Sequence, residues 1–195
     1  MDYFNRTKTI TTYIIGINVL IFIIEFFFGG STANNIITTT FTMYTPGVMQ
    51  GEIWRLFTSM FLHFGVIHLG MNMIALYNIG YFLENYVGSK KFLWIYLGGG
   101  ICGNLFVLLV DSLTNSYAVG AGASGAIFAV LGAILYIAKF EPYSKLDYQN
   151  ILFSVIFALL PGFMISGISL SAHIGGLIGG ILIYMTMTNI KLFKK

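Results

Sequence analysis

The sequence Ser171-Ala-His-Ile-Gly-Gly-Leu-Ile-Gly-Gly180 decides the fold of this chain. It opens an apolar run, residues 170–188, and it holds one titratable ring, His173, among glycines. The glycines repeat at four-residue spacing, in the pairs Gly175 with Gly179 and Gly176 with Gly180. Residues four apart share one face of a helix, and small residues on such a face let two helix backbones approach closely in lipid. We therefore expect a transmembrane helix that packs tightly on a neighbour.

The rest of the chain is also apolar. Of its 195 residues, 57% are hydrophobic and 9% are charged, whereas about a quarter of a soluble domain is charged. One water-soluble core of this size cannot bury so much apolar surface. A soluble enzyme, a nucleic-acid binder and a disulfide scaffold are therefore disfavoured, and the single cysteine, Cys102, has no internal partner. The composition predicts an all-α membrane protein, because the apolar runs are continuous rather than alternating.

Six stretches are apolar enough for spans, since a helix needs roughly 20 such residues to cross a bilayer. They are residues 10–28, 61–83, 92–110, 119–138, 151–164 and 170–188. The fifth is short and has Pro161 near its end, which makes it a candidate gate for substrate. No internal repeat divides the chain, so we predict one domain over residues 1–195.

The positions of the positive charges support six spans. With the amino terminus inside, nine of the ten basic residues fall on the inner side: Arg6, Lys8, Lys90, Lys91, Lys139, Lys145, Lys191, Lys194 and Lys195. Only Arg55 lies in an outer segment. Cytoplasmic loops are enriched in Lys and Arg, so both termini are predicted to be cytoplasmic.

Polar side chains cluster at one depth. Such groups are costly in a membrane and usually face the bundle interior or a water-filled site. Spans two, four and six enter from outside, and their outer halves hold the groups His63, His68, Asn72, Ser124 and His173. The glycine faces of the last span predict packing on the fourth, which would bring His173 within reach of Ser124.

These residue types suit nucleophilic catalysis. A serine hydroxyl needs a neighbouring base, and His173 could take its proton and then protonate the leaving amine. His68 and Asn72 share a helix face and, with the amide of Ser124, could stabilise an oxyanion. No carboxylate is visible near His173 and the positions of Glu25 and Glu52 are open, so we predict a Ser–His dyad.

His63 is assigned a structural role. It precedes His68 by five residues, which is roughly 140° around a helix, so both rings could not point at Ser124.

With these motifs in order, the chain resembles the rhomboid family of intramembrane serine proteases. The motifs are Trp54-Arg55 in the first outer loop, His68-Leu-Gly-Met-Asn72, Gly122-Ala-Ser-Gly125 and Ala172-His-Ile-Gly175. Each motif is weak alone, but the four together cover about residues 45–190 in order.

The resemblance implies a six-helix rhomboid-like bundle that cleaves peptide bonds in or near transmembrane segments of other proteins. It implies Ser124 as nucleophile, His173 as base and His68 with Asn72 as oxyanion donors. Gly122 would keep the preceding loop close to substrate. Phe128 stands where many members have a tyrosine stacked on the histidine, and Glu84 would be structural.

Three alternatives remain open. The first is a catalytically inactive chaperone or adaptor on the same fold. The second is a small transporter, which would need polar residues along a whole pore. The third is a zinc site from His63, His68 and His173, which lacks the carboxylate that zinc hydrolases typically use.

The expected partners are transmembrane protein substrates and the lipid bilayer. We expect no cofactor, no metal and no nucleic-acid partner. The expected location is a cell membrane, as a multi-pass protein, and the bacterial plasma membrane in particular.

Overall fold

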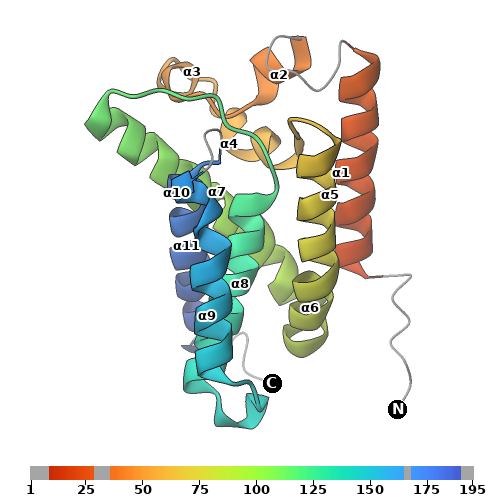
Figure 1. The fold of residues 1–195 in the computed structure, drawn as a ribbon, viewed down its shortest axis with the longest axis vertical. Coiled ribbons are helices and arrows are strands. Elements are labelled where there is room, and N and C mark those ends of the chain that lie inside the picture. Colours follow the sequence, from red (N-terminus) through yellow and green to blue (C-terminus); the bar gives the residue numbers. More distant parts are fainter. Residues whose placement is uncertain (1–8, 29–35, 165–167, 190–195) are drawn as a thin grey trace.

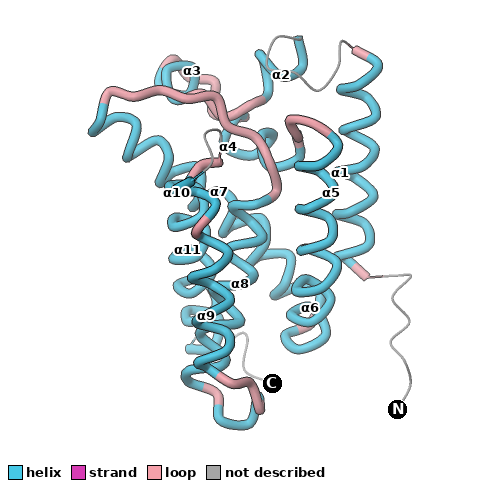
Figure 2. Tube along the Cα trace, in the orientation of Figure 1, coloured by secondary structure: helices cyan, strands magenta, loops and turns pink. Residues whose placement is uncertain are grey.

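The computed structural model describes residues 9–28, 36–164 and 168–189, which fold into a bundle of helices (Figure 1). The helices that build the bundle are α1 (Ile10–Phe27), α5 (Val66–Ala75), α6 (Tyr81–Val87), α7 (Ser89–Thr114), α8 (Ser124–Phe140), α9 (Tyr148–Leu159), the short α10 (Pro161–Met164) and α11 (Leu170–Asn189). A π-helical stretch, η3 (Leu76–Gly80), joins α5 and α6 into one continuous segment. The described part consists of helices and loops (Figure 2). One isolated bridge there pairs Met43 with Gly120.

The bundle is apolar outside and partly polar inside. Leu20, Phe27, Leu113 and Phe157 are exposed, and each lies on a long helix. Conversely, several charged and polar side chains are buried, among them Asn18, Glu25, Glu84, Asp111 and His173. This distribution is expected when lipid rather than water surrounds the helices, and it confirms a membrane protein.

Four helical segments are long and apolar enough to cross a membrane: Ile10–Phe27, Val66–Val87, Ser89–Thr114 and Leu170–Asn189. Two further apolar segments, Ser124–Phe140 and Tyr148–Met164, are shorter. The first and last predicted spans agree with α1 and α11 to within a residue, and α7 is longer at both ends than its prediction. The count of six spans therefore stays a prediction.

Two predicted spans begin later than the apolar pattern indicated. The second was expected from residue 61, but α5 begins at Val66, because Gly65 has a φ of +106° that breaks the helix. The fourth was expected from residue 119, but α8 begins at Ser124 after Gly122, which has a φ of +133°. The prediction that Ser124 lies several residues inside a helix was therefore wrong, since it is the first helical residue.

Glycines hold α7, α8 and α11 together. A Cβ on Gly176 would overlap the carbonyl of Gly125, and one on Gly180 would overlap that of Ala129, so this pair faces α8 as predicted. A Cβ on Gly179 would lie 2.5 Å from Cβ of Cys102, so the other pair faces α7 instead. The backbones of α8 and α11 thus meet directly at Gly176 and Gly180.

Carboxylates join the helices at the lower end of Figure 1. Glu84 near the end of α6 accepts hydrogen bonds from the amides of Ile10 and Thr11, both 2.8 Å, at the start of α1. Glu141, just after α8, accepts from the hydroxyls of Tyr86 (2.8 Å) and Tyr184 (2.7 Å) on α6 and α11. The start of α1 and the ends of α6, α8 and α11 therefore lie at the same side of the bundle.

The opposite end is covered by the first outer loop of the predicted topology, which joins the first two predicted spans. Its described part forms α2 (Ile36–Phe41), α3 (Thr45–Met49), α4 (Arg55–Thr58) and a 3₁₀ turn, η2 (Ser59–Phe61). Arg55 is buried, pairs with Glu52 and donates to the carbonyls of Thr42 (2.9 Å) and Thr39 (2.8 Å). Thr45 donates to Asp111 on α7 at 2.6 Å, so the loop is bound to the bundle.

The glycine contact yields a test of the packing. Gly180→Ala should destabilise the protein by about 1–3 kcal/mol, because the added carbon meets backbone atoms of Ala129 that cannot rotate away. Gly16→Ala on α1 is the matched control, since nothing lies within 4 Å of its added carbon. Thermal unfolding in detergent micelles measures the effect, and equal midpoints for the two variants would contradict the packing.

Candidate active site

Ser124 is held by the strand-like segment that precedes α8. Gly120 exchanges two backbone hydrogen bonds with Met43, of 2.8 and 2.9 Å, and the amide of Gly122 donates to the carbonyl of Ser59 at 2.9 Å. As the first residue of α8, Ser124 lies at a helix end where amide groups lack intrahelical partners and the dipole is positive. The hydroxyl is partly buried.

His173 meets this hydroxyl from α11. Its Nε2 lies 2.9 Å from Oγ of Ser124, which is a hydrogen bond between residues 49 positions apart. The ring of Phe128, one turn along α8 from Ser124, stacks on the imidazole with centroids 4.2 Å apart and planes 19° apart. The predicted approach of the two helices thus brings these side chains together, and Phe128 fixes the plane of the histidine.

No carboxylate supports the other ring nitrogen of His173 in the described part of the chain. Its Nδ1 is buried and has no hydrogen-bond partner there. The two candidates left open by the sequence have other partners: Glu25 accepts from the amide of His63, and Glu52 pairs with Arg55. The geometry is therefore that of a serine and a histidine without a third member.

His68 and Asn72 lie beside the backbone that leads to Ser124. A Cβ built on Gly122 would be 2.9 Å from Nε2 of His68 and 3.9 Å from Nδ2 of Asn72. Asn72 is buried, and Nδ2 donates one hydrogen bond to the carbonyl of His68 at 2.9 Å. Both side chains therefore lie close to the backbone that precedes α8.

The prediction that His63 lies apart from this cluster, because of its angle to His68 around a helix, was wrong. His63 precedes α5 and is not helical, so the angle around a helix does not apply. The ring is fully buried and lies edge-on to His68, with centroids 5.1 Å apart. Its Nε2 accepts from the amide of Ala123 at 3.4 Å. A structural role for His63 stays a prediction, but its place is beside the site.

The three histidines were also considered as a zinc site. Within the described residues, no group of three or more His, Cys, Asp or Glu side chains is arranged to hold a metal ion. The expected absence of a metal stays a prediction.

Asn104 was not singled out from the sequence. This α7 side chain donates to the carbonyl of Leu56 at 2.8 Å and to Oγ of Ser59 at 2.9 Å. Ser59 in turn accepts from the amide of Gly122. A lone amide in the third apolar run was the available signal, because a polar group at that depth needs a partner.

The comparisons with known proteins agree with this architecture. The family model described as the Rhomboid domain matches residues 50–190. The chain is 39% identical over 178 residues to the rhomboid protease GluP of Bacillus subtilis, covering 90% of this chain and 34% of GluP. A second Bacillus subtilis rhomboid, YdcA, is 34% identical and covers 92% of this chain and 89% of its own length.

The rhomboid protease AarA of Providencia stuartii is 30% identical over 200 residues, with 89% of this chain and 70% of AarA covered. The helical membrane bundle and these matches together place the chain in the class of rhomboid-like membrane proteins. The chain belongs to the rhomboid family. It spans about a third of the length of GluP and most of the length of YdcA.

Gly122 provides a test of the site's backbone. Gly122→Ala should slow labelling of Ser124 by a fluorophosphonate probe about 10- to 100-fold, because a Cβ is strained at a φ of +133° and would press on His68. Gly120→Ala is the matched control, since its Cβ would meet Cβ of Met43 at an ordinary 3.7 Å. Labelling rates that match between the two variants would refute this account of Gly122.

Proposed function

We propose that this chain is an intramembrane serine endopeptidase that cleaves peptide bonds in or near transmembrane segments of other membrane proteins. The observation that carries the proposal is the 2.9 Å contact between Ser124 Oγ and His173 Nε2 inside an apolar bundle. Membership of the rhomboid family and similarity to the named proteases GluP and AarA support the same activity.

The proposed reaction begins at this contact. His173 Nε2 takes the proton of the Ser124 hydroxyl while Oγ attacks the scissile carbonyl carbon. The imidazolium then gives that proton to the leaving amine, which completes the acyl-enzyme. A water molecule, deprotonated by the same nitrogen, hydrolyses the ester and restores the hydroxyl. Phe128 keeps the ring in one plane through both steps.

The oxyanion of each tetrahedral intermediate would be stabilised by the groups around Gly122. We assign this role to the side chains of His68 and Asn72 and to the amide of Ser124 at the start of α8. A helix N-terminus adds a favourable dipole for negative charge. Gly122 keeps the backbone close to His68, because its missing Cβ leaves no atom between them.

We further propose that the chain forms one domain with six spans and both termini in the cytoplasm. The start of α1 and the ends of α6, α8 and α11 share one side, which fits an even number of passes. Nine of the ten basic residues belong to that side in this arrangement. Its terminal members, Arg6, Lys8, Lys191, Lys194 and Lys195, lie outside the described residues. We assign the protein to the bacterial plasma membrane.

The substrate would enter beside α9. This helix has one buried residue, Val155, and exposes Phe153, Ile156 and Phe157 to lipid. It ends at Leu159, and Pro161 begins α10. Loose packing and a break at the end are properties of an element that moves, and the partners admitted there would be single transmembrane segments.

The alternatives make different predictions. An inactive adaptor needs no activated hydroxyl, so it would not react with a fluorophosphonate. A transporter needs polar groups through the whole bundle and would show substrate flux in liposomes. Zinc chemistry would be lost in a chelator, whereas the proposed dyad would retain its activity.

Ser124→Ala and His173→Ala should each abolish cleavage of a transmembrane reporter by the detergent-purified protein. The nucleophile is lost in the first variant, and its base in the second. Cleavage is followed by gel electrophoresis, with thermal unfolding as the folding control. A near-normal rate in either variant would overturn the proposed mechanism.

Asn72→Ala should reduce the turnover rate by about 100- to 1,000-fold at most, since one oxyanion donor is worth that much and others remain. Asn78→Ala is the matched control, because Asn78 also donates to a carbonyl four residues earlier, at 2.8 Å, but is exposed in η3. The turnover rate of both is measured on the same reporter. Equal losses would show that Asn72 contributes only through its local helix contact.

A further inference from the structure

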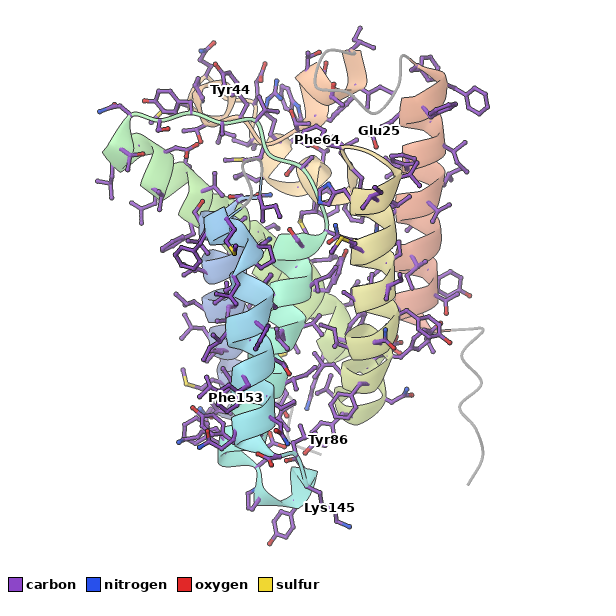
Figure 3. All side chains as sticks on the ribbon, in the orientation of Figure 1. Glu25, Tyr44, Phe64, Tyr86, Lys145 and Phe153 are labelled. Carbon is purple, nitrogen blue, oxygen red and sulfur yellow. The ribbon has the colours of Figure 1, made fainter. Side chains whose placement is uncertain are left out.

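Glu25 is a buried carboxyl that the proposed reaction does not use. It lies near the upper end of α1, beside the loop that carries Phe64 (Figure 3), and its side chain is fully buried. Its Oε2 accepts a hydrogen bond from the amide of His63 at 3.2 Å. A carboxyl buried in an apolar bundle is costly unless it makes a specific contact. The contact of Glu25 joins two residues that are 38 positions apart in the sequence.

The amide of His63 needs a partner from outside its own segment. His63 lies between the 3₁₀ turn that ends at Phe61 and the helix that starts at Val66, so no regular helical bond is available to it. Gly65, with a φ of +106°, turns the chain back, and its amide donates to the carbonyl of His63 at 3.0 Å. Glu25 therefore supplies the acceptor that holds the backbone of His63 in this turn.

The ring of His63 extends from this fixed backbone to the site. Its Nε2 accepts from the amide of Ala123, the residue directly before Ser124, at 3.4 Å. The same ring lies edge-on to His68 at 5.1 Å. A displacement of His63 would thus move the backbone before the serine and the ring beside Gly122 together.

We propose that Glu25 is a positioning residue for the cleavage reaction, which holds the His63 turn so that its ring supports the backbone of Ala123 and the ring of His68. The inference rests on the proposed protease function. Glu25 touches neither Ser124 nor His173, and it acts through the hydrogen bond to the amide of His63. The side chain must place an acceptor oxygen within hydrogen-bond distance of this amide, and it does not need a negative charge.

Two substitutions at Glu25 separate the effect of side-chain length from the effect of side-chain charge. Glu25→Gln keeps an acceptor oxygen at the same distance and loses the charge, whereas Glu25→Asp keeps the charge and is one methylene too short. The control is Thr11→Val on the same helix, which removes the 2.7 Å bond from Thr11 Oγ1 to Glu84 and loosens α1 at its other end. Each variant is measured for turnover rate and KM on the transmembrane reporter, for fluorophosphonate labelling, and for thermal unfolding.

Glu25→Asp should lower the turnover rate and the labelling rate by about 10- to 100-fold with KM little changed, because a displacement of about 1 Å at reacting groups costs that much. Glu25→Gln should stay within about threefold of wild type. Thr11→Val should unfold at a lower temperature but label at the wild-type rate. A double-mutant cycle of Glu25→Asp with His63→Leu should give much less than the sum of the two losses, since both act through one ring.

Three results would overturn the inference: equal activities for the Asp and Gln variants, losses in Thr11→Val as large as those in Glu25→Asp, or additive losses in the cycle. A wild-type chain that labels at Ser124 but does not cleave the reporter would overturn the protease function alone, and the labelling rates would still test Glu25. A wild-type chain that neither labels nor cleaves would overturn both.

Discussion

The site depends on the direct approach of two helix backbones, α8 and α11. Gly176 and Gly180 present no side chain where they meet the carbonyls of Gly125 and Ala129. Any larger residue would push α11 outward, and the imidazole of His173 would leave the serine hydroxyl. Because lipid offers no hydrophobic force to press helices together, this close packing must come from van der Waals contact between small residues. The same contact sets the distance between His173 Nε2 and Ser124 Oγ.

Around this contact, polar groups fix the remaining elements. A hydrogen bond in a lipid-surrounded interior has little water to compete with it, so each pairing can hold a helix end or a loop. Glu84 and Glu141 join helix ends on one side, and Arg55 and Asp111 organise the outer loop on the other. Ser124 and His173 therefore lie in a bundle whose two ends are both held by hydrogen bonds. The helix α9, with one buried residue, is packed more loosely.

The sequence predicted contacts correctly where a residue type has a single clear role in an apolar helix. Glycines at four-residue spacing indicated the contact of α11 with α8, and isolated polar groups in apolar runs indicated Ser124 and His173. It was misleading where backbone conformation decides the outcome. The positive φ values of Gly65 and Gly122 delay α5 and α8, and an apolar run carries no signal for that delay. The partner of Glu25 could not be predicted either, because the contact is to a backbone amide and obeys no periodicity.

The late start of α8 has a consequence for the position of the serine in the bundle. Ser124–Phe140 rises about 25 Å at 1.5 Å per residue, and Tyr148–Met164 is of similar length, whereas a hydrocarbon core is about 30 Å thick. In Figure 1 the chain from α7 runs across and downward before α8 begins. Most side chains of α8 are buried among the other helices, so protein rather than lipid surrounds the length by which it is short. Ser124, as its first residue, is therefore set back from the upper end of α7 in Figure 1, inside the bundle and not at its rim.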